Sequence, residues 1–277
     1  MACELKILLM VSVLVSILIP LANAKKPQVP CYFVFGDSLV DNGNNNDLET
    51  SAKANHLPYG IDFPDGPTGR FSNGRTMADF LAQLLGFDKF IPPFSTAIGT
   101  EILMGVNYAS AGAGIRDESG KRLTLYKYGA RKVVLLGLNK TGCIPAEIDV
   151  HDRNESSCVD KINSDVQLFN DMLISLVDIL NNDLTGANFI YVNMSLLSLG
   201  DSSSAGITVT NSPCCKGRCT RKQVPCTNRS TYAFWDRFHP TEAASSYLAS
   251  RAYAARTPFD AYPFDIRRLA LLYLYYR

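Results

Sequence analysis

Three side chains in this 277-residue sequence have the types that nucleophilic catalysis needs. Ser38 follows Gly36 and Asp37 at the end of a short apolar run, and Asp236 lies three residues before His239, one of only three histidines. A serine hydroxyl requires a base near neutral pKa, and that base requires an acceptor that fixes its tautomer. The pattern predicts Ser38 as nucleophile, His239 as general base and Asp236 as the acceptor.

Each of these motifs also has a simpler interpretation. Gly-Asp-Ser is common in tight turns. An aspartate three residues before a histidine, at the start of a helix, is also typical of a helix cap beside a surface histidine. The argument therefore depends on the motifs occurring together.

A third motif supplies donors for a developing oxyanion. Residues 105–114 read as a strand that runs into a loop of small residues, and the amide of Gly112 is a candidate donor beside that of Ser38. The alternative is that Gly112 serves only for close packing.

The elements that must position these residues alternate between strands and helices. Alternation of this kind predicts an α/β fold, a three-layer α/β/α sandwich with a parallel sheet that displays its site at the carboxyl ends of the strands. Ser72 or Asn73 is expected to cap the first helix and Gly86 to end it, and residues 41–46 are expected to form an ordered loop without the acidic spacing of a calcium site. The expected strands are 32–35, 105–109, 133–138 and 188–192, the expected helices are 76–85, 158–181 and 241–256, and residues 200–229 are expected to form a disulfide-stapled loop.

The N-terminus predicts secretion. Lys6 precedes an apolar run at residues 7–19, and Ala22-Asn23-Ala24 resembles a signal cleavage site. We therefore expect a signal peptide at 1–24, with an uncleaved anchor as the alternative, and a single catalytic domain at 25–277. The apolar run is short for a bilayer span, so no stable membrane insertion is expected.

The cysteines agree with an oxidising compartment. Cys3 lies within the predicted signal peptide and seven cysteines follow it, so we expect disulfides, with a zinc knuckle at 214–226 as the alternative. Cys143 and Cys158 are a plausible pair, and Cys31 is expected to be an unpaired, buried thiol. The acceptor motifs for N-glycosylation begin at Asn139, Asn154, Asn193 and Asn228.

Charge excludes one class of partner. The net charge is +1, from 27 basic and 26 acidic side chains without long runs, so no nucleic-acid partner is expected. The charge carries no information on the oligomeric state.

Together the motifs resemble the plant branch of the GDSL esterase/lipase family, also called SGNH hydrolases. The resemblance implies that Ser38 attacks an ester or lipid carbonyl, that His239 transfers the proton and that Asp236 orients it. The amides of Ser38 and Gly112 would hold the oxyanion, with no metal or cofactor. The segments that carry the resemblance are 33–45, 107–112, 128–133, 142–145, 236–240 and 260–263.

One family block is absent from the sequence. The family's Gly-x-Asn-Asp motif, whose Asn completes the oxyanion hole, is expected between residues 112 and 128, but residues 115–127 contain no asparagine. The resemblance therefore implies a sheet about one central strand short. Asn139 is a poor substitute because of its loop position. The alternatives are an impaired or noncatalytic secreted binding protein and an acyltransferase that uses the same triad.

Overall fold

The computed structural model describes residues 26–114, 125–151, 158–199, 202–217 and 219–272. Its centre is a three-stranded sheet in the order β1-β2-β5, in which β1 and β2 are parallel from Lys132↔Asn188 to Leu136↔Val192 and β5 is antiparallel to β2. A second sheet pairs β3 with β4. The strands are β1 (Lys132–Leu136), β2 (Asn188–Val192), β3 (Val209–Pro213), β4 (Tyr232–Phe234) and β5 (Ala261–Tyr262).

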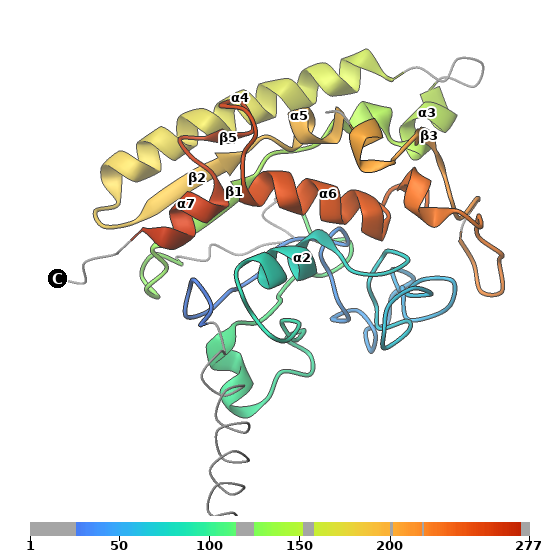
Figure 1. The fold of residues 1–277 in the computed structure, drawn as a ribbon, viewed down its shortest axis with the longest axis horizontal. Coiled ribbons are helices and arrows are strands. Elements are labelled where there is room, and N and C mark those ends of the chain that lie inside the picture. Colours follow the sequence, from blue (N-terminus) through green and yellow to red (C-terminus); the bar gives the residue numbers. More distant parts are fainter. Residues whose placement is uncertain (1–25, 115–124, 152–157, 200–201, 218, 273–277) are drawn as a thin grey trace, which may run out of the picture.

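Helices cover both faces of the three-stranded sheet (Figure 1). The longest helix, α4, packs on the face that carries Val133 and Phe189, whereas α2, α6 and α7 pack on the face that carries Val134 and Ile190. The α-helices are α2 (Met77–Leu84), α3 (Pro145–His151), α4 (Asp160–Asp183), α5 (Met194–Leu199), α6 (Glu242–Tyr253) and α7 (Ile266–Leu271). Short 3-10 helices are η1 (Gly99–Met104), η2 (Thr141–Cys143), η3 (Ser202–Ala205) and η4 (Arg229–Thr231).

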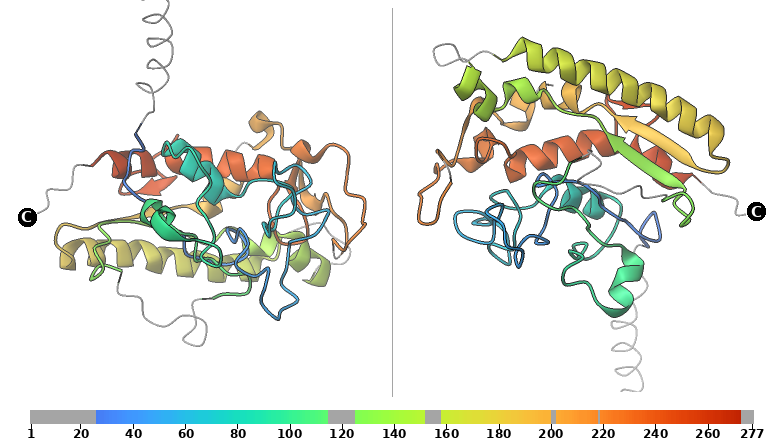
Figure 2. Two further views of the ribbon diagram at one scale, coloured as in Figure 1. Left: turned by 90° about the horizontal axis from the view of Figure 1, so that it is seen from below. Right: turned by 180° about the vertical axis from the view of Figure 1, so that it is seen from behind.

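The α/β class and the three layers are therefore confirmed, and the expected strand at 188–192 is β2. The two predicted strands at 32–35 and 105–109 are reduced to one parallel bridge, Val34↔Asn107. They remain hydrogen bonded, since Val34 N donates to Val106 O at 3.1 Å and Tyr108 N donates to Val34 O at 2.8 Å. No described strand joins this pair to β1, so the parallel sheet is split into two parts (Figure 2).

The three predicted helices are present, with one error at a cap. The prediction that Ser72 or Asn73 caps the first helix is wrong, because Thr76 is the cap residue and its amide donates to Asp79 Oδ2 at 2.8 Å. Asn73 is instead used in tertiary contacts with Asp62 and with the amide of Glu242. Sequence spacing could not separate these neighbouring polar residues because all of them are good caps.

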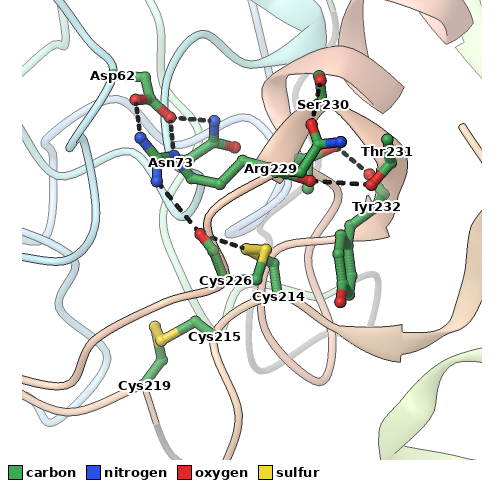
Figure 3. The surroundings of a disulfide bond; sticks show 12 residues. Asp62, Asn73, Cys214, Cys215, Cys219, Cys226, Arg229, Ser230, Thr231 and Tyr232 are labelled. Carbon is green, nitrogen blue, oxygen red and sulfur yellow. Dashed lines mark hydrogen bonds and ion pairs between the residues drawn. A yellow bond between two sulfur atoms is a disulfide. The ribbon is translucent and has the colours of Figure 1, made fainter. Parts of the chain in front are cut away.

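The disulfides follow the expected pattern. Figure 3 shows two of them, Cys214–Cys226 and Cys215–Cys219, in the loop before β4. The third joins Cys143 to Cys158. Among the described cysteines Cys31 is unpaired as predicted, but it is half-buried rather than buried. Cys3 and Asn154 lie outside the described residues.

A buried ion pair fixes the end of α6. Arg251 Nη2 lies 2.6 Å from Asp260 Oδ1, and both side chains are at least nine-tenths buried. Burial by itself raises the pKa of Asp260, but hydrogen bonds from Arg251, Thr257 and the Arg256 amide outweigh it and hold the pKa below its ordinary value. The ionised pair therefore stabilises the fold above the ordinary carboxyl pKa, and this contribution is lost as the pH falls below that value.

We expect Asp260→Asn to lower the free energy of unfolding by about 3–5 kcal/mol at neutral pH, because it leaves Arg251 buried without a counter-charge. The control is Asp149→Asn, which breaks an exposed pair with Arg237 and is expected to cost less than about 1 kcal/mol. Urea unfolding at pH 7 measures both, and the difference is expected to shrink on acidification. Equal losses in the two variants would contradict the assignment.

Candidate active site

The structure brings the three predicted catalytic side chains into one hydrogen-bonded chain. His239 Nε2 lies 2.8 Å from Ser38 Oγ, and His239 Nδ1 lies 2.8 Å from Asp236 Oδ2. Ser38 and His239 are 201 residues apart in the sequence, so only the tertiary structure could bring them together. Ser38 is half-buried, whereas Asp236 and His239 are buried.

Local structure explains how each residue is held. Ser38 follows the extended segment at 32–35, here called the Val34 segment. It lies in a turn in which Asp37 Oδ1 accepts from the Leu39 amide at 3.0 Å. On the other side of the site, Asp236 Oδ1 accepts from the amides of Phe238 and His239 at 2.8 and 2.9 Å. These bonds close a tight turn that aims the His239 ring back at the Asp236 carboxylate, just before α6 begins.

Two aromatic residues that sequence reasoning missed complete the surroundings. Tyr59 Oη donates to Asp236 Oδ2 at 2.8 Å, and the Phe71 ring lies 5.1 Å from the His239 ring. Both belong to the buried cluster around Trp235 and the disulfides. No sequence signal identified Tyr59, because it lies 177 residues from Asp236 in a region without regular structure.

The buried carboxylate is held in its charged form. Burial raises the pKa of Asp236, but the charge of His239 and its hydrogen bond, the Phe238 amide and the Tyr59 hydroxyl lower it more. The net pKa of Asp236 lies below its ordinary value. The ionised form suits the acceptor that fixes the His239 tautomer and stabilises an imidazolium.

The loop at 41–46 is ordered, as predicted, and it also ties the candidate oxyanion segment to Ser38. The buried carboxylate of Asp41 accepts from the amide of Gly43 at 2.8 Å and from the amide of Ala111 at 2.9 Å. Asn44 Nδ2 donates to the carbonyl oxygen of Ala109 at 2.7 Å, and Ser110 Oγ donates to Asn45 Oδ1 at 2.7 Å. The loop thus fixes residues 109–111 by side-chain hydrogen bonds rather than by sheet pairing.

Gly112 follows this fixed segment. It is exposed with a φ of +88°, a backbone region that glycine enters without strain, and no described atom would meet a Cβ there within 4 Å. Packing against the described residues therefore does not explain the glycine, whereas the backbone conformation does. Within the described part of the chain, neither the Ser38 nor the Gly112 amide donates a hydrogen bond.

The other predicted residues lie away from this chain of hydrogen bonds. Asn139 Oδ1 accepts from Thr141 Oγ1 at 3.3 Å in a local turn after β1. Asn193 Oδ1 accepts from the Leu196 amide at the start of α5, and Asn228 is exposed. Among the described residues there is no group of histidine, cysteine, aspartate and glutamate suited to a metal ion. Nor does any described helix combine the length and apolar character needed to cross a bilayer.

Comparison with known proteins identifies the family. The model of the family described as GDSL-like lipase/acylhydrolase matches residues 32–128 and 118–252, and these ranges contain all three residues of the hydrogen-bonded chain. The protein belongs to this family, a class of hydrolases that act on ester bonds.

Relatives from Arabidopsis thaliana cover nearly the whole chain. GDSL esterase/lipase At1g29660 is 39% identical over 89% of this chain and 93% of its own length. GDSL esterase/lipase At1g29670 is 40% identical over 88% and 92%, and GDSL esterase/lipase 7 is 35% identical over 89% and 93%. The alignment with At1g29660 extends over 339 positions, more than the 277 residues of this chain, so the alignment contains gaps in the sequence of this chain.

We expect Tyr59→Phe to lower kcat by about two- to tenfold with little change in KM, the equivalent of one lost hydrogen bond of about 0.5–1.5 kcal/mol. The Tyr59 hydrogen bond lowers the pKa of Asp236, so its removal raises that pKa and the carboxylate becomes protonated at a higher pH. The acidic limb of the kcat/KM profile is therefore expected to move to higher pH.

The matched control is Tyr232→Phe. Tyr232 packs against the same cluster, but its hydroxyl makes no hydrogen bond in the described part of the chain, so its profile is expected to match the wild type. A Tyr59→Phe profile that also matches the wild type would show that the hydroxyl has no role in positioning Asp236.

Proposed function

We propose that this chain is a secreted serine ester hydrolase that cleaves carboxylic esters or lipids. The observation that carries the proposal is the continuous chain from Ser38 Oγ through the His239 ring to Asp236, with both links at 2.8 Å. This is the arrangement that activates a serine hydroxyl: a base on the nucleophile and an acceptor on the base.

The reaction follows from this geometry. Ser38 Oγ attacks the ester carbonyl carbon while His239 Nε2 takes its proton, and the His239 imidazolium then gives that proton to the departing alcohol. The negative charge on the carbonyl oxygen develops where the amides of Ser38 and Gly112 are proposed to donate. Water, activated by His239, repeats the sequence and releases the acid.

The secreted character rests on several sequence and structural features. A signal peptide at 1–24 would export a single catalytic domain at 25–277 to an oxidising compartment. Three disulfides are consistent with such a compartment, because disulfides persist there. Asn139, Asn154, Asn193 and Asn228 are proposed glycosylation sites, of which the exposed Asn228 is the most accessible described one.

We expect Ser38→Ala to reduce hydrolysis of p-nitrophenyl butyrate to the uncatalysed background, a loss of at least about 10³-fold. Its free energy of unfolding is expected to stay within about 0.5 kcal/mol of the wild type, since a half-exposed hydroxyl contributes little to packing. Asp236→Asn is expected to retain more activity than His239→Ala, because a poorly oriented base is better than none.

The control is Ser175→Ala, an exposed serine in α4 that is expected to behave as wild type. Labelling by a fluorophosphonate at Ser38 distinguishes an enzyme from a noncatalytic binding protein. Full turnover in the Ser38→Ala variant would rule out Ser38 as the nucleophile. Ester product formed with an added alcohol, in preference to hydrolysis, would favour the acyltransferase alternative.

We further propose that the oxyanion hole lacks its side-chain donor and that the sheet lacks a strand. Three observations support this: residues 115–127 contain no asparagine, the two parts of the family match meet at 118–128, and the alignments are longer than the chain. Asn139 is a poor replacement, because it lies in a local turn after β1 in which its side-chain oxygen accepts from Thr141.

Loss of one oxyanion donor typically costs about 10²–10³ in kcat. We therefore expect the purified chain to hydrolyse p-nitrophenyl butyrate about 10²–10³ times more slowly than GDSL esterase/lipase At1g29660 assayed in parallel. Active-site titration with a fluorophosphonate normalises both rates to competent serine. Equal normalised turnover would mean that another group supplies the donor.

A further inference from the structure

One buried asparagine holds the segment that leads to Gly112. Asn45 is 3% exposed, and its Nδ2 donates to the carbonyl oxygens of Ala52 at 3.1 Å and Ala111 at 2.9 Å. Its Oδ1 accepts from Ser110 Oγ at 2.7 Å. The reversed amide would place Oδ1 against two carbonyl oxygens, so the neighbours of Asn45 fix its orientation.

The carbonyl that Asn45 holds belongs to the same peptide unit as the Gly112 amide. The Ala111–Gly112 bond is trans, and in a planar trans peptide the C=O and N–H groups point in opposite directions. The hydrogen bond from Asn45 to the Ala111 oxygen therefore directs the Gly112 N–H away from Asn45. Within the described part of the chain this N–H meets no acceptor, so it is available to a substrate oxygen.

The backbone around Gly112 supports this direction. Ala113 N donates to Ser110 O at 2.9 Å, which closes a four-residue turn with Ala111 and Gly112 at its centre. Among these two central residues only Gly112 has a positive φ, the pattern of a type II turn. The peptide between the central residues is thus held by the turn on one side and by Asn45 on the other.

The turn also lies beside the nucleophile. The Ser110 amide donates to the Gly36 carbonyl oxygen at 3.1 Å, and the two candidate oxyanion donors, Gly112 and Ser38, each follow two residues later. This pairing brings the two donor segments side by side.

Asp41 connects the same two segments through its carboxylate. Its amide donates to the Asp37 carbonyl oxygen at 3.0 Å, which closes the turn around Ser38. Its Oδ2 accepts from the Ala111 amide at 2.9 Å. Asp41 therefore fixes the N–H of Ala111, while Asn45 fixes the carbonyl of the same residue.

We propose that Asn45 is a positioning residue for the oxyanion hole, which holds the Ala111–Gly112 peptide so that the Gly112 N–H points at the reacting ester oxygen. The inference rests on the proposed function. Negative charge develops on that oxygen in the transition state, so a donor held in one direction stabilises the transition state more than the bound ester. Asn45 therefore acts on kcat rather than on KM.

The test is Asn45→Asp, which keeps the shape of the side chain but places an acceptor against the Ala111 carbonyl oxygen. With p-nitrophenyl butyrate, kcat is expected to fall about 10- to 100-fold, less than the loss of a whole oxyanion donor, with KM within about twofold. Titration with a fluorophosphonate normalises the rates to competent serine.

A trifluoromethyl ketone provides a readout that is independent of turnover. Ser38 Oγ adds to its carbonyl carbon, and the carbonyl oxygen becomes an oxyanion that imitates the transition state. Its inhibition constant is expected to rise in Asn45→Asp by the same factor by which kcat falls.

A milder variant and a matched control accompany this test. Ser110→Ala removes only the hydroxyl that donates to Asn45 Oδ1, and it is expected to lower kcat by at most about tenfold. Asn181→Asp is the control, because Asn181 Nδ2 in α4 likewise donates to a backbone carbonyl oxygen, that of Phe189 at 3.0 Å. This variant is expected to be less stable than the wild type but to keep its normalised kcat and inhibition constant.

The outcomes separate this inference from the proposed function. An active wild type whose kcat and inhibition constant are unchanged in Asn45→Asp would overturn the inference alone, as would equal losses in Asn45→Asp and Asn181→Asp. A rise in KM without a fall in kcat would also overturn it. A wild type with neither turnover above the Ser38→Ala background nor fluorophosphonate labelling would overturn the proposed function together with the inference.

Discussion

The site depends on one buried carboxylate. Asp236 is only 4% exposed, and a charged oxygen at such a position is stable only if donors surround it. The donors come from the turn that contains Asp236 and from Tyr59, which is distant in sequence. The same hydrogen bonds fix the orientation of the His239 ring, and this orientation determines the distance from His239 Nε2 to Ser38 Oγ.

A second buried carboxylate has a comparable structural role on the other side of Ser38. Asp41 is fully buried, and its hydrogen bonds hold the segment that leads to Gly112. Burial raises the pKa of Asp41 despite three backbone donors that lower it, so its environment is less charge-stabilising than that of Asp236. The candidate oxyanion segment is therefore built on a polar loop, and its described hydrogen bonds do not involve β1.

This independence explains how an intact hydrogen-bonded triad coexists with a divided sheet. The Val34 segment and β1 contact the same hydrophobic core through Tyr32 and Val134, yet no described strand bridges them. Side-chain packing on one face connects the two parts, and no described strand pairs with the second edge of β1. Site geometry and sheet completeness are thus set by different interactions in this chain.

The sequence alone determined the residue types and the local elements. The Ser38, Asp236 and His239 motifs, the strand at 188–192, the three longest helices and the pairing of Cys143 with Cys158 were all predictable, because each depends on spacing or chemistry within a short segment. Only the tertiary structure decided that Tyr59 donates to Asp236, that Thr76 rather than Ser72 or Asn73 caps α2, and that no described strand lies between β1 and the segment around Val34. Those features depend on which distant segments meet, and contact across 177 residues, as between Tyr59 and Asp236, is set by packing of the whole core rather than by any local pattern.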